Sequence, residues 1–364
     1  MRTVVVYLAS LSASGGKERV VSNLLIEWVK RYKVIVITED NKEPFYPIPK
    51  DVNHITLNLP FMRQMFNLNS SKASRAAATC LNMIRSIHLL RKTLLEIEYD
   101  YLYVTTPLNA FEAFRAMDDP EHKLVISEHA SIHAYNSIYS KMKEKIYPKA
   151  YCVSVPNKMD TEEYKTWGCN AVYIPHPITF SLDRDISEKE KIVLNVGRLT
   201  SDKQQDALIS IWEKIDKKMR KDWELWIIGS GEDEEKLKEI ISKQDDGTIH
   251  LFPATKDIAS IYKKASVFAF TSRTEGFGMV LLEAMAFGVP CISFDCPSGP
   301  RDVIKDGKNG FLVENMNATA FLNKLEILLS MKDNDYNQMR ENAYNTVESW
   351  STESIMEKWD CVFK

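Results

Sequence analysis

The feature that most constrains the fold is a repeated alternation of short β-branched runs with longer amphipathic segments. The runs occupy residues 3–8, 33–38, 101–105, 123–127, 151–155 and 171–174, followed by 192–196, 224–228, 248–252, 267–270 and 291–294. Strands that alternate with amphipathic helices are typical of parallel sheets covered by helices. Two sets of them in 364 residues, a length beyond one compact core, predict an α/β protein with two Rossmann-like domains.

The domain boundary is expected where the strand and helix alternation stops. Pro175-His176-Pro177 breaks the chain and a polar stretch from 181 to 191 follows. We therefore expect domains at residues 1–180 and 181–349. The last segment, 350–364, has apolar residues at helical spacing, so it needs a groove to cover. These residues are Ile355, Met356, Trp359, Val362 and Phe363.

Composition excludes several classes of protein. The net charge of −3 disfavours a nucleic-acid binder. Charged residues interrupt every apolar stretch before the roughly 20 residues that span a bilayer, which predicts a soluble or peripheral protein. The six cysteines lack C-x-x-C spacing, so we expect a reducing, cytoplasmic location and no structural metal.

One segment, 61–92, has an unusual charge composition. It has six basic residues and no acidic one, interleaved with Met, Phe, Leu and Ile side chains. The basic residues are Arg63, Lys72, Arg75, Arg85, Arg91 and Lys92. Two interpretations stay open: a core-packed helix with a solvated basic face, or a surface for anionic lipid or a pyrophosphate-bearing acceptor at the inner face of a membrane.

Each expected domain has an anion-binding candidate after its first strand. Gly15 and Gly16 precede a helix, where glycine lets a ligand approach the backbone and the helix N-terminus offers free N–H groups. In the second domain, Arg198 and Lys203 follow the strand at 192–196. At the carboxyl end of a parallel strand, the arginine guanidinium and the lysine ammonium are well placed to hold a diphosphate.

The richest motif runs from Thr271 to Ala286. A strand ends, the turn Glu275-Gly276-Phe277-Gly278 follows, and a helix with Met279 and Val280 in its first turn is expected to start near Gly278. Amides of that first turn are free to bind phosphate oxygens. Glu283 lies inside this apolar helix, where a carboxylate is costly unless polar groups meet it. Sugar hydroxyls are one such partner, and backbone donors are the alternative.

These segments, together with Gly197-Arg198-Leu199 and Gly229-Ser230-Gly231-Glu232, resemble the E-x7-E glycosyltransferases, family 4, of GT-B fold. The resemblance covers nearly the whole chain, and Asp295 to Pro300 resembles members that build lipid-linked or surface polysaccharides. It implies two Rossmann-like domains facing an interdomain cleft, with a final helix that crosses back to pack on the N-terminal domain. It also implies a metal-independent, retaining transferase without a cofactor.

The resemblance also implies roles for individual residues. The N-terminal domain would bind the acceptor and the C-terminal domain the nucleotide sugar, with Glu283 on the ribose and Arg198 and Lys203 on the diphosphate. Glu275 through Val280 would meet the sugar and phosphates, and Glu275 and His129 would be the catalytic residues. The chain departs from the family at His176, where relatives often carry asparagine, and at Pro253, where a glycine commonly precedes the nucleobase contact.

The predicted activity is transfer of a sugar from a uridine diphosphate (UDP) donor to a hydroxyl of a glycan or a lipid-linked saccharide, in polysaccharide or glycoconjugate biosynthesis. Two alternatives stay open. One is a UDP-sugar epimerase of GT-B fold, which would act on the donor alone. The other is a non-catalytic protein that binds a nucleotide sugar.

Overall fold

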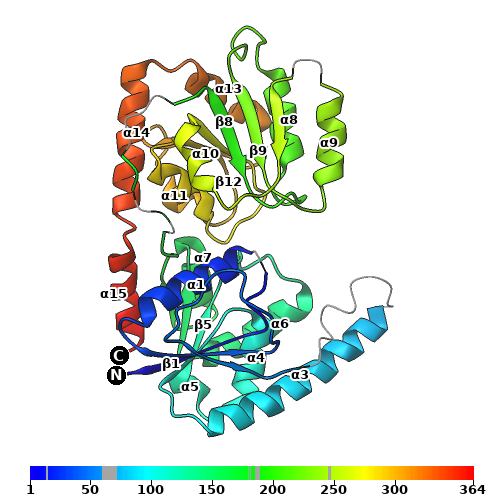
Figure 1. The fold of residues 1–364 in the computed structure, drawn as a ribbon, viewed down its shortest axis with the longest axis vertical. Coiled ribbons are helices and arrows are strands. Elements are labelled where there is room, and N and C mark those ends of the chain that lie inside the picture. The colour runs from blue at the N-terminus through cyan, green and yellow to red at the C-terminus, as the bar shows by residue number, and fades with distance from the viewer. Residues whose placement is uncertain (14, 60–71, 179, 181, 185–188, 245–246) are drawn as a thin grey trace. The chain divides into compact units, whose positions relative to one another are not determined.

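The computed structural model describes residues 1–364 except 14, 60–71, 179, 181, 185–188 and 245–246, and only the backbone of 72–78. The chain divides into two compact units. Unit 1 comprises Met1–Pro177 and Ile355–Lys364, and unit 2 comprises Ile178–Ser354. Each is a parallel sheet with helices packed against it (Figure 1).

In unit 1 the described residues form a 7-stranded parallel sheet of order β3-β2-β1-β4-β5-β6-β7. The strands are β1 (Thr3–Leu8), β2 (Lys33–Thr38), β3 (Asn53–Thr56), β4 (Tyr101–Val104), β5 (Leu124–Ser127), β6 (Cys152–Val155) and β7 (Ala171–Tyr173). The chain starts in the middle and winds outward in both directions. This doubly wound order brings the loops after β1, β2, β4 and β5 to one edge of the sheet.

Two apolar layers cover the sheet of unit 1. The helices are α1 (Gly16–Trp28), α3 (Lys72–Leu95), α4 (Pro107–Ala116), α5 (Pro120–Lys123), α6 (Ser137–Ile146) and α7 (Lys158–Thr166), with a short 3-10 turn at Tyr147–Lys149. α1 packs on one face through Val21, Leu25 and Trp28. α3, α4, α6 and α7 pack on the other. Alternate strand residues supply both layers because β1 and its neighbours are buried on both sides.

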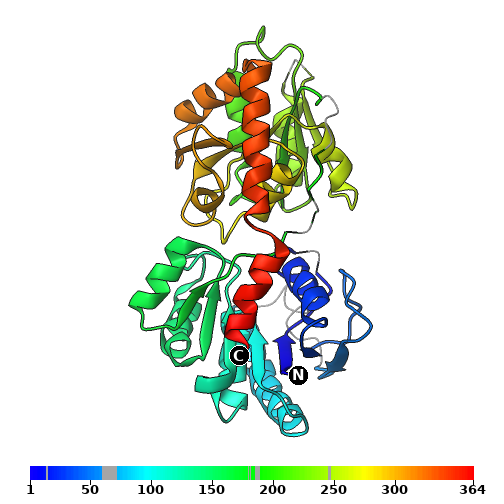
Figure 2. The same cartoon turned by 90° about the vertical axis from the view of Figure 1, so that its left-hand side faces the viewer.

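The final helix, α15 (Thr352–Val362), packs on unit 1 beside α1, as the sequence predicted. Ile355, Met356, Trp359 and Val362 of this helix are buried, as is Phe363 just after it. The Trp359 ring lies edge-on to Trp28 with centroids 5.1 Å apart, and Arg31 forms an ion pair with Asp360 at 2.6 Å. Figure 2 shows this helix bringing the C-terminus beside the N-terminus, and Tyr101 donates a hydrogen bond to the Lys364 carbonyl at 2.6 Å.

Unit 2 repeats the same strand order. Its described residues form a 6-stranded parallel sheet, β10-β9-β8-β11-β12-β13. The strands are β8 (Ile192–Val196), β9 (Glu224–Ile228), β10 (Ile249–Phe252), β11 (Val267–Phe270), β12 (Cys291–Asp295) and β13 (Gly310–Glu314). The first strand of the unit is again central, so the loops after β8 and β11 are neighbours at the carboxyl edge.

The helices of unit 2 also form two layers. They are α8 (Gln205–Lys214), α9 (Glu234–Ser242), α10 (Ile258–Lys264), α11 (Met279–Ala286), α12 (Pro300–Val303), α13 (Ala318–Leu329) and α14 (Asp333–Glu348). One apolar layer is centred on α8 and α13. The other layer is centred on α10, α11 and α14.

All eleven expected strands are present, with ends shifted by one residue at most. Two strands were missed, β3 and β13. β3 pairs with β2 and has the largely polar sequence Asn-His-Ile-Thr. β13 starts at Gly310 directly after Asn309, and this Asn-Gly pair is a typical turn sequence. Both are edge strands with a neighbour on one side.

Within the described residues, no helix combines the length and the apolar character needed to span a membrane. The six cysteines are free thiols. The expectations for Arg63 lie outside the described residues, and those for the side chains of Lys72 and Arg75 do too.

Candidate functional site

In unit 1, Gly15 caps the N-terminus of α1. A side chain at Gly15 would place its Cβ 2.5 Å from the Glu18 carboxylate, which folds back over the first turn and forms an ion pair with Lys17 at 3.0 Å. A carboxylate near a helix N-terminus is stabilised by the free amides there. Gly16 faces open space. The turn expected to receive an anion therefore already carries an acidic group of its own.

His129 leaves the carboxyl end of β5 and stacks on His176. The ring centroids are 4.8 Å apart and the planes differ by 15°. The Tyr103 hydroxyl lies 3.5 Å from Nε2 of His129, and Nδ1 is buried without a hydrogen-bond partner among the described residues. Burial lowers the pKa of His129 well below its usual value and lowers that of His176 to about 3. Both rings are thus neutral at neutral pH.

A buried ion pair anchors the loop that carries His129. Glu128 receives hydrogen bonds from the hydroxyls of Tyr147 at 2.5 Å and Tyr135 at 3.3 Å, and lies 3.5 Å from the ammonium of Lys143. Lys143 is fully buried and also donates to the Ile132 carbonyl at 3.2 Å, so the loop is held at two points. Burial lowers the pKa of Lys143, with Glu128 opposing the shift.

Sequence reasoning missed Lys143, although a signal for it existed. Tyr139, Lys143 and Ile146 are spaced at i, i+4 and i+7 along α6, which places the lysine on the inward face between two large side chains. A cation at such a position indicates a buried acidic partner.

In unit 2, glycines let two loops approach closely at the end of β8. A Cβ at Gly229 would lie 1.9 Å from the Gly197 carbonyl oxygen, and one at Gly231 would lie 2.2 Å from that of Leu199. Leu199 N–H donates to the Ser230 carbonyl at 3.1 Å. These contacts fix the loop that presents Arg198, whose exposed side chain has no ion pair among the described residues.

The structure brings Lys203 and Glu275 together as an ion pair, although 72 positions separate them in the chain. Their loops are joined at the carboxyl edge of β8 and β11. The Thr271 hydroxyl donates to the carbonyls of Lys203 and Gln204 at 3.1 Å each, and Arg273 N–H donates to the Asp202 carbonyl at 2.7 Å. The Glu275 side chain is 11% exposed and that of Lys203 is 27% exposed. The pair is therefore largely enclosed, yet a ligand could reach it.

Three polar atoms on these strands and loops are buried without hydrogen-bond partners among the described residues. They are Oδ1 of Asn195, Oε1 of Gln204 and Oγ of Ser272. Most buried polar groups in proteins have hydrogen-bond partners, so three exceptions close together suit a site where a ligand or water binds. Sequence reasoning missed all three, because they stand out only after the loops are folded together.

The turn before α11 has the backbone that its glycines permit. Gly278 has φ of 83° and precedes Met279, the first helical residue. Phe277 is buried against the Trp350 ring, with centroids 5.1 Å apart. A Cβ at Gly299 would lie 2.4 Å from the Phe277 carbonyl oxygen, so the loop after β12 packs directly against the turn. The structure thus gives Phe277 a packing role that the sequence did not indicate.

Glu283 lies on the second turn of α11 and is 2% exposed. The Tyr262 hydroxyl, from α10, donates a hydrogen bond to its carboxylate at 3.2 Å. The expected buried carboxylate is present, and one partner is a side-chain hydroxyl rather than a backbone donor.

Comparison with known proteins identifies the family. The sequence pattern of the family described as glycosyl transferases group 1 matches residues 180–346. The chain is 29% identical to the amylovoran biosynthesis glycosyltransferase AmsD of Erwinia amylovora, over 99% of both chains. It is 27% identical, over 99% of this chain and 97% of the other, to the GalNAc-alpha-(1->4)-GalNAc-alpha-(1->3)-diNAcBac-PP-undecaprenol alpha-1,4-N-acetyl-D-galactosaminyltransferase of Campylobacter jejuni.

Solved structures share the fold along the whole chain. TarM superposes with a TM-score of 0.81 at 16% identity, covering 100% of this chain and 99% of TarM. Anabaena HepE in complex with UDP and glucose superposes with a TM-score of 0.74 at 16% identity, covering 99% and 98%. With the family pattern in unit 2, relatives that match end to end and solved structures of the same fold, the chain is a glycosyltransferase of GT-B fold whose residues 180–346 carry the glycosyl transferases group 1 pattern.

Proposed function

We propose that this glycosyltransferase moves a sugar from a UDP-sugar to a hydroxyl of a glycan or lipid-linked saccharide, with retention of anomeric configuration. The observation that carries the proposal is the Lys203–Glu275 ion pair beside the N-terminus of α11. It combines a cation for a diphosphate with a carboxylate for sugar hydroxyls. Relatives named for polysaccharide biosynthesis and for an undecaprenol-linked saccharide support the acceptor class, and the UDP complex of HepE supports the donor.

The leaving diphosphate is the charge that the site must stabilise. An ammonium has three N–H donors, so Lys203 keeps Glu275 as a partner and adds a phosphate oxygen. Arg198 and the first-turn amides of α11, at Met279 and Val280, supply further donors. Donors already in place where charge develops lower the barrier most, because they need little reorganisation. Glu275 holds the sugar, and Glu283 binds the ribose hydroxyls.

The transfer step exchanges two bonds at the anomeric carbon. The bond to the β-phosphate oxygen breaks and its electron pair leaves with UDP. The acceptor hydroxyl oxygen forms the new bond on the same face and passes its proton to the departing phosphate. In this proposal neutral His129 of unit 1 contacts the donor sugar, and Gly15 and Gly16 contact its phosphates. A buried neutral imidazole suits a hydrogen bond to a sugar hydroxyl and adds no charge next to the positive centre.

A donor panel tests this proposal. The protein is incubated with UDP-glucose, UDP-galactose and their N-acetylamino analogues, with and without saccharide acceptors, and with or without EDTA. We expect UDP release and a longer saccharide that persist in EDTA. Arg198→Ala should reduce the rate, whereas Arg184→Ala should not, because Arg184 bonds to Glu341 and Glu348 of α14. Conversion of the donor alone would indicate an epimerase, and UDP-sugar binding without turnover would indicate a binding protein.

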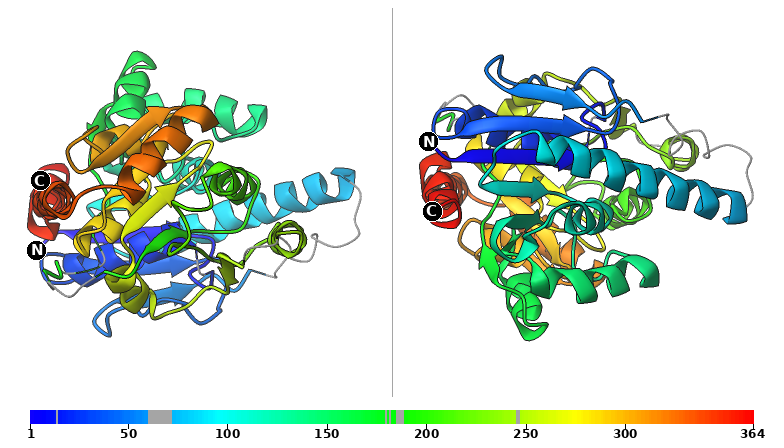
Figure 3. Two further views of the ribbon diagram at one scale, coloured as in Figure 1. Left: turned by 90° about the horizontal axis from the view of Figure 1, so that it is seen from above. Right: turned by 90° about the horizontal axis from the view of Figure 1, so that it is seen from below.

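The same chain is proposed to meet an anionic membrane surface through segment 61–92. The described part of α3 supports this: Leu81 and Ile84 are 47% and 62% exposed, beside the exposed Arg85. Figure 3 shows this helix projecting from unit 1. Each cation near an anionic leaflet contributes about 1 kcal/mol, and exposed apolar side chains can enter the headgroup layer.

Sedimentation with anionic liposomes tests the membrane proposal. Replacing Arg63, Lys72 and Arg75 with Gln should reduce sedimentation at low salt and leave UDP binding unchanged. The matched control replaces Arg2, Lys30 and Lys165, which form surface ion pairs elsewhere in unit 1. Wild-type protein that does not sediment at low salt would contradict the proposal.

A further inference from the structure

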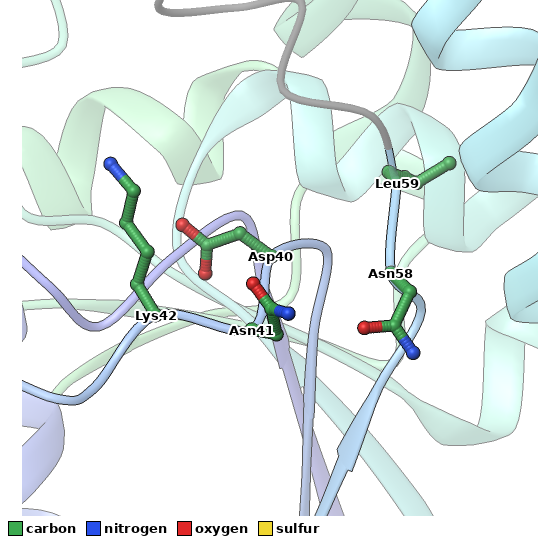
Figure 4. Close-up of a pocket in the computed structure, with 5 residues that line it drawn as sticks. All are labelled: Asp40, Asn41, Lys42, Asn58 and Leu59. Atoms are coloured by element: carbon green, nitrogen blue, oxygen red, sulfur yellow. The ribbon is translucent and has the colours of Figure 1, made fainter.

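A cavity of about 340 Å³ lies at the carboxyl edge of unit 1, between the loops that follow β2 and β3. Figure 4 shows Asp40, Asn41 and Lys42 on one side and Asn58 and Leu59 on the other. The volume is at the lower end of the range for small-ligand sites, about 300–1,000 Å³. The lining is one apolar side chain among polar ones, which suits a sugar ring with its hydroxyl rim and its C–H face.

Asp40 is the unusual residue of this cavity. It is 6% exposed, and both carboxylate oxygens are buried without a hydrogen-bond partner among the described residues. An ionised carboxylate in that condition costs free energy unless donors reach it. Carboxylates have capacity for several hydrogen bonds, including two from neighbouring hydroxyls. Asp40 is thus ready to accept hydrogen bonds that the described residues do not supply.

The backbone holds Asp40 in place. Its N–H donates to the Ala9 carbonyl at 3.4 Å, and its own carbonyl accepts from the Thr38 hydroxyl at 2.7 Å. Leu59 N–H donates to the Glu39 carbonyl at 2.8 Å, which ties the two cavity walls together. These backbone hydrogen bonds hold the loop, so the Asp40 carboxylate cannot reach a new partner through a small loop movement.

Buried carboxylates neighbour Asp40, and their charge decides which kind of ligand the cavity can take. Glu39 and Glu112 are both buried and both accept hydrogen bonds from the Tyr7 hydroxyl, at 3.1 and 2.9 Å. Asn109 donates to the same two carboxylates, at 3.4 and 3.1 Å. Among the described lining residues Lys42 is the one cation, against the three carboxylates of Asp40, Glu39 and Glu112, so the region is net negative and disfavours a phosphate. The occupant is therefore a donor of hydroxyl hydrogen bonds rather than an anion.

The strand order fixes how far this cavity lies from His129. Asp40 follows β2 and His129 follows β5, and the order β2-β1-β4-β5 separates them by three strand spacings, about 14 Å. That distance exceeds the width of one sugar ring. A single monosaccharide at His129 does not reach Asp40, whereas a chain of two or more sugars along the edge does.

The geometry points to a second saccharide subsite at this cavity, where Asp40 accepts hydrogen bonds from a sugar unit remote from the reacting hydroxyl. The subsite rests on the proposed function, because His129 marks the reacting end only if the chain is a sugar transferase of the kind proposed. The acceptor is then an oligosaccharide, and Asp40 is a specificity-determining residue that distinguishes long acceptors from short ones.

Binding and transfer are measured separately to test the subsite. The probes are methyl α-glycosides of N-acetylgalactosamine, of its α-1,4-linked trisaccharide, and of glucose and maltotriose. Binding is read by saturation-transfer NMR, which needs no turnover. Asp40→Asn should raise the dissociation constant of a trisaccharide about tenfold or more, because bonds to a charged acceptor are the stronger ones. It should leave the binding of monosaccharides and the release of UDP by donor hydrolysis unchanged.

Two further variants complete the test. Glu43→Gln makes the same acid-to-amide change at an exposed position of the same loop and should have no effect. Asn41→Ala should weaken trisaccharide binding without touching Asp40. The melting temperature of Asp40→Asn should stay level or rise, because a buried charge without partners is removed. Equal trisaccharide binding by wild type and Asp40→Asn, or no trisaccharide binding by wild type, overturns the subsite. Trisaccharide binding without UDP release from any donor counts instead against the proposed function.

Discussion

The two units share one strand order but present different chemistry at the same edge of the sheet. In unit 2, the loops after β8 and β11 carry a cation, Lys203, paired with a carboxylate that solvent still reaches. In unit 1, the segments after β5 and β7 carry neutral stacked imidazoles, and the loop after β2 carries buried acids. The family pattern matches 180–346, which is nearly all of unit 2 and none of unit 1 before Ile178. From this comparison we propose that unit 2 binds the charged diphosphate and unit 1 binds sugar hydroxyls.

The largest effect is expected when the Lys203–Glu275 ion pair of unit 2 is removed. Lys203→Ala and Glu275→Ala should each lower kcat/KM about thirtyfold or more, about 2 kcal/mol, because each leaves the other charge unpaired beside the substrate. Glu275→Ala should act mainly on kcat. The double variant should lose little more than the worse single variant, since the two side chains act as a unit.

The control for this cycle is Lys236→Ala. Lys236 also forms an ion pair with an acid of unit 2, Asp206 at 2.7 Å, but half of its side chain is exposed. Surface pairs of this kind contribute little, so its kinetics should match wild type. Strictly additive losses in the Lys203 and Glu275 cycle would mean that the pair has no joint role.

The second test concerns the neutral imidazoles of unit 1. The folded pKa of His176 is about 3, below the ordinary value near 6.5, so the unfolded chain binds the proton first. Stability is therefore complete above about pH 6.5 and is lost as the pH falls towards 3. Between pH 7 and 5 the His176 term alone should lower the free energy of unfolding by about 2 kcal/mol. Urea unfolding of wild type and His176→Asn at both pH values measures it.

His122 offers the opposite sign in the same unit. It is exposed, and Asp119 raises its pKa, so its contribution is present at low pH and is lost as the pH rises. His122→Asn should leave the wild-type loss of stability at pH 5 in place. If His176→Asn loses as much stability as wild type between pH 7 and 5, the stacked imidazoles are not the buried neutral pair that the structure shows.

The smallest expected effect concerns Tyr262 and tests whether Glu283 binds the ribose. Tyr262→Phe removes one hydrogen bond to this carboxylate and should lower the free energy of unfolding by about 1 kcal/mol. It should also weaken UDP affinity several-fold, because a less firmly held carboxylate pairs less well with the ribose. Glu283→Ala should weaken UDP affinity further.

Tyr336→Phe is the matched control for Tyr262→Phe. It removes a hydroxyl that donates to the Ser266 carbonyl at 2.8 Å in the same unit. We expect a similar loss of stability and unchanged UDP affinity by calorimetry. Equal UDP affinity in wild type, Tyr262→Phe and Glu283→Ala would move the ribose site away from α11.

The elements of the fold could be predicted because they depend on local patterns. Buried parallel strands are short β-branched runs, and the apolar spacing of 352–362 predicted a helix that needs a groove. Two strands were missed for local reasons: β3 has a single aliphatic residue, Ile55, and β13 begins at the turn signal Asn309-Gly310. Helical periodicity could have predicted that Lys143 is buried. Its role depends on the ion pair with Glu128, which lies in another part of the chain.

The sequence by itself determined the two doubly wound sheets and the family motif with Glu275, Gly278 and Glu283. Only the tertiary structure decided which of these side chains meet. Lys203 pairs with Glu275, His129 stacks on His176, and the Asp40 carboxylate has no hydrogen-bond partner among the described residues. The physical reason is that strand order, not sequence distance, sets which loops share an edge. Whether a buried polar atom finds a partner is fixed only when those loops close on one another.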